Sequence, residues 1–483
     1  MNISRRAMSS ITIQPAKIVS QKTHQVAGKF LTSPYRHDAK SLPKEHPGRL
    51  SVTEHFFDVP KDYSKPESST IKVFGRSIRK HENPIFPKKE KEQLPWLCYL
   101  QGGPGMNCRP PQHYPWTDRF LDAGYQLFYL DQRGTGLSTP VTASTLQMRG
   151  YNDVQAKYLK LYRADNIVRD AEAIRQALTA DYPEEKKKWS IMGQSFGGFC
   201  SITYLSFYPQ GLRESFIFGG LQPLVKNPDE VYRHCYRKVA ERNKAYYNKY
   251  PEDVERVHLI MRYLSRFGDG KIKLPSEGNL TRRRFRAMGI SLGAHGGIDS
   301  IHDVVLRASS DIEAFGHITR GSLSAIDHMT SYDDNLLYAI LHEPIYCEGQ
   351  APNWSAQRML DEYPEFNIDT EGPVLFTGEM IYPWMFEDYS ELRKVQDVAN
   401  RIAADADWPA LFDEQQLAKN EVPVYAASYL EDMYVASDLA LATAKKIKGC
   451  KVFTTNVMFH DAVRSKMDEV VGQVLKLRDD IVD

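Results

Sequence analysis

The chain lacks several features that would assign it to a class at once. Its 62 basic and 61 acidic residues leave a formal net charge of +1, so it lacks the surplus positive charge that attracts nucleic acid or an anionic membrane. No apolar run approaches the roughly 18 residues of a membrane span, and no apolar core of a secretory signal stands near the start. We therefore expect neither a nucleic-acid partner nor a membrane partner.

The six cysteines lack the spacing of a metal site or of a disulfide framework. They are scattered, without CxxC pairs and without histidines at metal-ligand spacing, at positions 98, 108, 200, 235, 347 and 450. Such cysteines are typical of reduced, partly buried thiols, which favours an intracellular compartment. We expect the cytoplasm, no bound metal and no cofactor.

The N-terminal region lacks acidic side chains. Residues 1–37 contain six basic residues and neither Asp nor Glu. This composition resembles a mitochondrial presequence, so the mitochondrial matrix is the alternative location. The interpretation that we prefer is a basic arm over residues 1–49 that is disordered or loosely docked.

Beyond this arm, strand-like segments alternate with helix-like ones. Helical spacing of apolar residues predicts helices at 164–180 and 437–448 and from residue 461 onward. This alternation is typical of a mostly parallel α/β sheet with helices on both faces. Short apolar or alternating runs predict strands over 52–59, 70–78, 96–100, 125–130, 189–192, 215–221, 422–428 and 451–455, the first two as an antiparallel pair.

The middle of the chain lacks this alternation. From residue 226 to 370 helical spacing dominates, and basic clusters such as Arg282–Arg286 fit solvated helix faces. We find no internal repeat. The sequence therefore predicts one sheet domain, formed by residues 50–225 and 371–483 and interrupted by a helical cap at 226–370.

A serine lies between two glycines directly after the predicted strand 189–192. The segment Gly193–Gly198 reads GQSFGG and precedes an apolar, helix-like run. Glycines around a serine between a strand and a helix are typical of the nucleophile elbow, a tight turn that strains the serine backbone and exposes its hydroxyl. Ser195 is thus the candidate nucleophile, and the alternative is an ordinary glycine-rich turn.

A serine hydroxyl needs a base that removes its proton during attack. In folds with this elbow the chain order is serine, then an acid, then histidine, each on a loop after a strand. Asp432 and His460 follow the last two predicted strands in this order. Asp432 would orient the imidazole and stabilise its cation, and Glu431 and Asp438 are the rival acids.

A glycine loop, Gln101–Gly105, follows the predicted strand 96–100. Glycines at this place let backbone N–H groups approach a developing oxyanion, and we assign the two donors to Gly103 and Phe196. The alternative is a phosphate cradle. However, the loop lacks the Lys-Ser/Thr of a P-loop, and no dinucleotide fingerprint follows it.

Three motifs together carry a family resemblance. Gly102–Gly105, Asp131–Ser138 and Gly193–Gly198 stand in the order and spacing of the prolyl aminopeptidase (proline iminopeptidase) family, serine peptidases of the α/β-hydrolase superfamily. The resemblance covers roughly residues 50–483. The first family motif usually begins with His, whereas this chain has Gln101. That departure resembles a larger-capped branch and puts in doubt a side-chain role there, but not the backbone donors.

The resemblance implies an α/β-hydrolase fold with a cap, and removal of an N-terminal residue, usually proline, from small peptides with a free amino terminus. In the family two cap glutamates bind that amine, and the matching candidates are Glu343 and Glu379. Carboxylates suit this role through charge-assisted hydrogen bonds, and the alternative is an ion pair with a cap arginine. Candidates for a wall around the proline ring, or for plain core, are Tyr346, Trp354, Tyr382, Trp384 and Phe386.

We expect Arg133 and Asp131, in the second motif, to be structural. A guanidinium on the loop after a central strand can bind neighbouring carbonyls and brace the oxyanion loop. Neither residue is expected to act directly in catalysis.

Two other function classes stay open. The triad does not choose the acyl substrate, so an esterase, lipase or amidase is possible on the same fold. The second class is a catalytically silent binding protein. Epoxide and haloalkane hydrolases are disfavoured because they have Asp where this chain has Ser195. The cap glutamates discriminate between an aminopeptidase and an esterase, since an esterase has no use for them.

Overall fold

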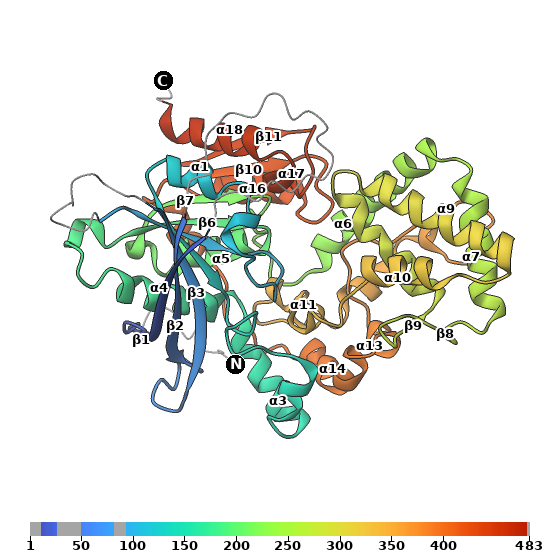
Figure 1. The fold of residues 1–483 in the computed structure, drawn as a ribbon, viewed down its shortest axis with the longest axis horizontal. Coiled ribbons are helices and arrows are strands. Elements are labelled where there is room, and N and C mark those ends of the chain that lie inside the picture. Colours follow the sequence, from blue (N-terminus) through green and yellow to red (C-terminus); the bar gives the residue numbers. More distant parts are fainter. Residues whose placement is uncertain (1–10, 27–49, 82–92, 481–483) are drawn as a thin grey trace.

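A nine-stranded β-sheet forms the centre of the larger lobe in the computed structural model, which describes residues 11–26, 50–81 and 93–480 (Figure 1). The strand order is β1-β2-β3-β5-β4-β6-β7-β10-β11. The pairs from β1 to β5 are antiparallel, and the rest of the sheet is parallel. The strands are Lys17–Val26 (β1), Leu50–Pro60 (β2), Thr70–Lys80 (β3), Trp96–Leu100 (β4), Gln126–Asp131 (β5), Trp189–Gln194 (β6), Leu212–Phe218 (β7), Val424–Tyr429 (β10) and Cys450–Thr455 (β11).

The predicted strands all occur, with ends displaced by at most three residues. Strand β7 ends earlier than predicted because Gly219 adopts a left-handed φ of +53°. Within the predicted loose arm, residues 17–26 form β1 instead, so the prediction is wrong for this segment. Its side chains are almost all exposed, and backbone pairing with β2 holds it, so no alternation of apolar residues marks it in the sequence. The other parts of the arm, 1–10 and 27–49, lie outside the described residues.

Helices cover both faces of the sheet, as predicted. One face packs against α4 (Ala164–Leu178), α5 (Phe196–Phe207) and α16 (Ser437–Lys446), and the other against α1 (Thr117–Asp122) and α18 (Met467–Asp479). Alternate residues of β4 enter the two cores: Cys98 and Leu100 one, Leu97 and Tyr99 the other. A strand buried on both faces is apolar at every position.

Most of the chain between β7 and β10 forms a second, helical lobe, on the right in Figure 1. Asn243 of its first helix bonds both the N–H and the carbonyl of Phe376 at 2.8 and 2.9 Å, so the segment around Phe376 packs with this lobe. The domain boundaries stay a prediction. The helices of this region are Asp229–Lys249 (α6), Asp253–Arg266 (α7), Arg282–Arg286 (α8), Gly297–Phe315 (α9), Arg320–Met329 (α10), Leu336–Leu341 (α11), Ser355–Leu360 (α12), Met385–Asp388 (α13), Gln396–Ala404 (α14) and Glu414–Ala418 (α15), with the short strands Ile272–Lys273 (β8) and Asn279–Leu280 (β9).

Two short helices, α2 (Ala143–Gln147) and α3 (Asn152–Leu159), follow β5, and α17 (Ala462–Ser465) precedes α18. The final predicted helix from residue 461 is thus two helices. Lys466, between them, has non-helical backbone angles of φ −131° and ψ 36°.

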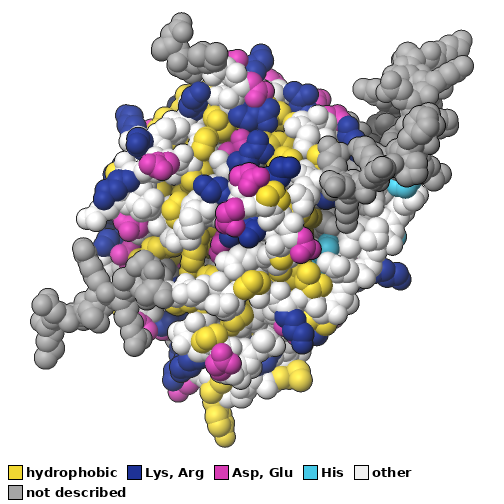
Figure 2. Space-filling view, turned by 90° about the vertical axis from the view of Figure 1, so that its left-hand side faces the viewer, with side chains coloured by type: hydrophobic (Ala, Val, Ile, Leu, Met, Phe, Trp, Pro, Cys, Tyr) yellow, Lys and Arg dark blue, Asp and Glu magenta, His cyan; other side chains and the backbone are white. Residues whose placement is uncertain are grey.

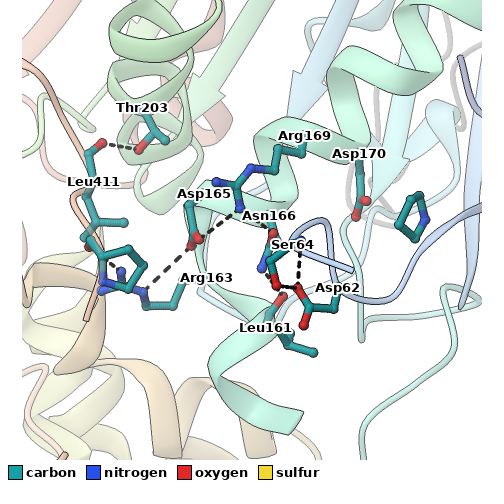
Figure 3. A network of polar contacts seen from close by, with 12 residues as sticks. Asp62, Ser64, Leu161, Arg163, Asp165, Asn166, Arg169, Asp170, Thr203 and Leu411 are labelled. Atoms are coloured by element: carbon teal, nitrogen blue, oxygen red, sulfur yellow. Dashed lines mark hydrogen bonds and ion pairs between the residues drawn. The ribbon is translucent and has the colours of Figure 1, made fainter. Parts of the chain in front are cut away.

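A buried polar network joins the sheet lobe to the segments that leave the cap (Figure 3). Arg163, before α4, pairs with Asp165 at 3.8 Å and donates to the carbonyl of Pro409 at 2.7 Å. Thr203 of α5 donates to the carbonyl of Leu411 at 2.8 Å. Because α5 directly follows the predicted elbow, these bonds tie the returning chain to the helix behind Ser195.

Charges of both signs are mixed on the surface. Figure 2 shows the face of the sheet lobe on which Lys and Arg side chains are interspersed with Asp and Glu side chains. This distribution fits the nearly neutral composition. Among the helices of the described parts of the chain, none combines the length and the apolar character needed to cross a bilayer.

Candidate active site

The turn between β6 and α5 has the geometry of a nucleophile elbow. Ser195 has φ +55° and ψ −128°, a conformation that residues other than glycine rarely adopt. A Cβ on Gly193 would overlap the carbonyl of Gly197, and a Cβ on Gly197 would overlap the carbonyl of Leu100. The glycines therefore allow α5 to begin at once, with a partly exposed Ser195 at the carboxyl end of β6.

Asp432 and His460 meet at the same edge of the sheet. The Nδ1 atom of His460 lies 2.8 Å from Oδ2 of Asp432. The other oxygen of Asp432 accepts the N–H groups of Tyr434 and Val435 at 2.8 and 3.0 Å, which fixes the carboxylate. Burial lowers the pKa of His460, but the carboxylates of Asp432 and, after it, Glu379 more than offset this, so the pKa lies above its usual value.

Two glycines at the end of β7 bring Ser195 next to this pair. A Cβ on Gly220 would overlap the carbonyl oxygen of Ser195, and one on Gly219 would lie 3.4 Å from both Asp432 Oδ2 and His460 Nδ1. The three predicted triad residues thus surround one dipeptide, although they are far apart in the sequence. Their catalytic roles stay a prediction, which this placement favours.

The rival acids have other surroundings. Glu431 lies 3.9 Å from Nζ of Lys238 in an ion pair. Glu431 and Asp438 line an open cavity of about 330 Å³ between α6 and the loop after β10, where Asp432 is also part of the wall. Asp432 is the carboxylate that accepts the hydrogen bond of His460 Nδ1, so the geometry favours Asp432 as the acid.

The glycine loop after β4 lies against the elbow. A Cβ on Gly102 would lie 3.1 Å from Cβ of Ser195, and Gly103 has a φ of +132°, which favours glycine. Phe196 is the first residue of α5, so its N–H is one of the N-terminal groups that have no partner within the helix. The oxyanion roles of Gly103 and Phe196 stay a prediction consistent with this arrangement.

The surroundings of Asp131 and Arg133 favour the expected structural roles, and the lack of a direct catalytic role stays a prediction. Asp131 is buried and accepts the N–H groups of Cys108 and Leu137 at 2.8 and 3.1 Å, which joins two loops at the site. Arg133 is also buried and binds both carboxylate oxygens of Asp170 at 2.7 and 2.6 Å. Its remaining hydrogen bonds go to the carbonyls of Pro60, Lys61 and Leu161, so it binds neighbouring carbonyls as expected, but these lie outside the oxyanion loop.

Glu379 is a largely buried carboxylate of the cap within electrostatic reach of His460. Its oxygens lie 2.5 Å from the hydroxyl of Tyr338, which donates, and 3.5 Å from Nε2 of His342. Burial raises the pKa of Glu379, but His342, His460 and Tyr338 reverse this, so the pKa lies below its usual value. The side chain keeps 15% of its surface exposed, so an ionised carboxylate remains accessible.

Glu343 is more deeply buried, with 4% of its surface exposed. Its oxygens accept the backbone N–H groups of Ser355 and Ala356 at 3.0 and 2.9 Å, in the first turn of α12. Burial raises the pKa of Glu343 to about 8 in spite of these bonds. A carboxyl held in this way accepts hydrogen bonds from N–H groups that have no partner within the helix at its N-terminus. Its role in amine binding stays a prediction, which the geometry favours less than that of Glu379.

Aromatic side chains surround Glu379. The rings of Tyr338 and His342 are stacked at 5.0 Å, and the hydroxyl of Tyr232 lies 3.2 Å from Nδ1 of His342. Tyr346 lies 6.4 Å from the His342 ring and 5.4 Å from that of Phe199 in α5. Tyr346 therefore joins the surroundings of Glu379 to the helix behind Ser195.

The other predicted wall residues pack with one another. Trp354 lies 5.6 Å from Phe386, and Tyr382 is stacked on Trp384 at 5.5 Å. The hydroxyl of Tyr382 lies 2.9 Å from that of Tyr236. These contacts favour the core interpretation for the four residues.

Tyr338 and His342 were missed in the sequence analysis. They are four residues apart, on α11 and at its C-cap, and so lie on one helix face. Two polar aromatic residues at this spacing, one within the apolar run Leu336–Leu341 and one directly after it, are the signal that could have found them. Tyr434, whose ring lies 4.7 Å from that of His460, carries no such signal.

Comparison with known proteins agrees with this architecture. The profile of the α/β hydrolase fold family matches residues 95–300. A solved α/β fold family hydrolase from Bacillus anthracis is 13% identical and covers 88% of this chain and 99% of that one, at a TM-score of 0.38. That TM-score is too low to support an argument about fold or function, and the agreement rests on the family profile.

Two relatives align over most of their length. The chain is 42% identical over 472 residues to proline iminopeptidase aneH of Aspergillus aculeatus, covering 98% of this chain and 99% of that protein. It is 38% identical over 428 residues to a proline iminopeptidase of Aeromonas sobria, covering 88% and 96%. The chain therefore belongs to the proline iminopeptidase (prolyl aminopeptidase) family of the α/β-hydrolase fold.

Proposed function

We propose that the protein is a serine aminopeptidase that releases an N-terminal residue, preferentially proline, from small peptides with a free amino terminus. The observation that carries the proposal is Glu379, a partly accessible carboxylate of the cap whose contacts are Tyr338 and His342 and which lies within electrostatic reach of His460. In the described parts of the chain its bonds come from Tyr338 and His342, and no Lys or Arg pairs with it. It can therefore accept an ammonium group through charge-assisted hydrogen bonds.

The proposed reaction uses the groups gathered at the sheet edge. Ser195 attacks the carbonyl carbon of the first peptide bond while His460 removes the hydroxyl proton, and Asp432 holds the imidazole in the required tautomer. The N–H groups of Gly103 and Phe196 stabilise the oxyanion. His460 then protonates the leaving amine of the peptide. Water, deprotonated by His460, hydrolyses the acyl-enzyme and releases the amino acid.

The restriction to one residue follows from the position of the ammonium group. In an N-terminal residue this group is separated from the scissile carbonyl carbon by only the Cα atom. A carboxylate that binds it must therefore lie just beyond the nucleophile, as electrostatic reach from Glu379 to His460 supports. Tyr346 and Tyr338, near Glu379, are suited to contact a flat pyrrolidine ring.

The test is a panel of aminoacyl-naphthylamides compared with their N-acetylated forms. We expect proline-naphthylamide to be the best substrate and acetylation to abolish turnover, because it removes the positive charge. Equal hydrolysis of free and acetylated substrates would instead favour an amidase or esterase. A protein that a fluorophosphonate probe does not label would be catalytically silent.

We also propose that the protein acts in the cytoplasm, supported by its six free cysteines. Subcellular fractionation with N-terminal sequencing of the mature protein tests the location. Loss of about the first 30 residues, the usual length of a cleaved targeting segment, would favour the mitochondrial matrix instead.

A further inference from the structure

Cap residues 290–295 contact both loops that carry the proposed acid and base. This segment ends the 3-10 helix Ala287–Gly293 and leads to α9. On the acid side, the hydroxyl of Tyr434 donates to the carbonyl of Ile290, and a Cβ on Gly293 would overlap the Tyr434 ring. The Tyr434 ring in turn lies edge-on to His460 at 4.7 Å. The cap is thus fitted closely against one neighbour of the imidazole.

On the base side, His295 binds the residue that follows His460. Oδ1 of Asp461 accepts the backbone N–H of His295 at 3.0 Å and lies 2.6 Å from its Nδ1 atom. Asp461 is the N-cap residue of α17, yet its side chain makes no capping hydrogen bond there. An N-cap aspartate normally bonds its own helix. Here the carboxylate is used instead to bridge the sheet lobe and the cap.

The residue before His460 is held by the cap as well. The guanidinium of Arg242, on α6, lies 4.5 Å from the ring centre of Phe459, and its Nε atom donates to the carbonyl of Leu292 at 3.0 Å. The His295 ring lies 4.9 Å from the Phe459 ring. The cap therefore contacts both chain neighbours of His460, on the side of the sheet lobe where α17 faces α6 (Figure 1).

We propose that His295 is a positioning residue: through Asp461 it keeps the His460 loop in register with the cap. The His460 imidazole is then aligned with Ser195 only when the cap, which carries the amine-binding carboxylate, is in its place. A displacement of about 1 Å in a catalytic group can cost roughly 100-fold in rate, so the contact affects turnover without touching the substrate. The inference rests on the proposed function of His460, but Glu379 takes no part in it.

The first test uses three substitutions of His295. His295→Ala removes the Nδ1 atom that contacts Asp461, and we expect kcat for proline-naphthylamide to fall about tenfold, with KM changed less than twofold. His295→Asn places an amide N–H near the position of Nδ1 and should restore most of the activity. His295→Gln places it farther out and should not. The control is His328→Ala, an exposed histidine of the same lobe on α10, which should behave as wild type.

An increase in KM without loss of kcat would overturn the proposal, as would equal activity of the Asn and Gln variants. Those two variants keep a polar side chain, so the comparison remains valid if the alanine variant folds poorly. A purely structural role would lower thermal stability in all three variants without separating Asn from Gln in kcat.

The second test is the rate of labelling by a fluorophosphonate, which requires Ser195 and His460 but no bound amine. We expect His295→Ala to slow labelling by the same factor as kcat, and normal labelling with reduced kcat would overturn the proposal. Asp461→Ala should slow it at least as much, and the double variant no further. Additive losses would show that the two residues do not act together.

The two proposals can fail separately. If the wild type is not labelled at all, the proposed function fails. The contact of His295 and Asp461 is then judged by a double-mutant cycle on thermal unfolding, where absence of coupling would overturn it also.

Discussion

The edge of the sheet and the interior of the cap both contain buried carboxylates, but they hold them in different ways. At the sheet edge, backbone N–H groups of Tyr434 and Val435 fix one oxygen of Asp432 and leave the other for His460. In the cap, side chains alone hold Glu379. A carboxylate fixed by backbone has one orientation and suits the alignment of a base. A carboxylate held by a hydroxyl and an imidazole can exchange a partner for an incoming ammonium group.

Glu343 extends this comparison into the cap, because it is a cap glutamate whose carboxyl is held by backbone N–H groups, as that of Asp432 is. Its pKa of about 8 and the lowered pKa of Glu379 show the consequence. Near neutral pH the Glu343 carboxyl is therefore largely protonated, and the Glu379 carboxyl is ionised.

The largest effect is expected from Ser195→Ala at the sheet edge. Removal of a serine nucleophile lowers kcat by about 10⁶-fold in comparable enzymes, so hydrolysis of proline-naphthylamide should become undetectable. The control is Ser206→Ala. Ser206 lies near the end of α5, the helix that begins after Ser195, and its hydroxyl donates to the carbonyl of Ile202 and has no role in the mechanism. Turnover above about 1% of wild type in Ser195→Ala would rule out this serine, since residual catalysis without a nucleophile is far smaller.

The next effect is expected from Asp432→Asn, which breaks the alignment of the base. We expect kcat to fall about 10⁴-fold, as in other triads. The base must be neutral to act, so the rate rises as the pH passes the pKa of His460, which Asp432 raises. Its removal should therefore move the acid limb of the pH–rate profile to lower pH.

Glu431→Gln is the control for Asp432→Asn and should leave rate and profile unchanged, because Glu431 bonds Lys238 rather than His460. If the acid limb did not move after Asp432→Asn, Asp432 would not be the group that raises the pKa of the His460 imidazole. A large loss of rate in Glu431→Gln would transfer the role to that residue.

Glu379→Gln tests the cap side of the comparison. Truncating one partner of a buried charge pair costs about 2–5 kcal/mol, so kcat/KM for proline-naphthylamide should fall about 100-fold. Hydrolysis of a neutral p-nitrophenyl ester, which has no amine, should change less than twofold. Equal losses on both substrates would assign Glu379 to the catalytic centre itself and remove the basis for amine recognition.

The sheet and its edge were largely predictable from the sequence because local rules determine them. Strand β4 is apolar at every position. The elbow needs glycine at 193 and 197, because a Cβ at either position would overlap a backbone carbonyl. Chain order then pointed to Asp432 and His460, and the structure places these two in contact. Such features depend on backbone geometry, which leaves a pattern in short segments.

The cap could not be predicted to the same depth, because its arrangement depends on contacts between distant segments. Which of Glu343 and Glu379 remains accessible is decided by where α12 begins, and no local pattern shows that the N–H groups of Ser355 and Ala356 reach Glu343. His295 likewise gains its partner 166 residues away. Strand β1 is held by pairing rather than burial and left no apolar pattern.

The smallest effect on turnover is expected from Glu343→Gln. KM and kcat should change less than twofold, because the amide still offers one acceptor to α12, and loss of the other hydrogen bond costs about 1 kcal/mol of folding free energy. Burial raises the pKa of Glu343 to about 8 in the folded protein, above the value of about 4.3 in an unfolded chain. The folded state thus holds this proton more tightly than the unfolded state.

That difference contributes stability that is fully present below about pH 4.3 and is lost as the pH rises to about 8. The wild type should therefore lose stability relative to Glu343→Gln between pH 5 and 8, as measured by urea unfolding at several pH values. The exposed Glu365→Gln is the control and should show no such trend. If Glu343→Gln instead reduced kcat/KM as strongly as Glu379→Gln, both cap glutamates would bind the amine, and a backbone-held carboxylate would have to be counted among the ligand-binding groups of this site.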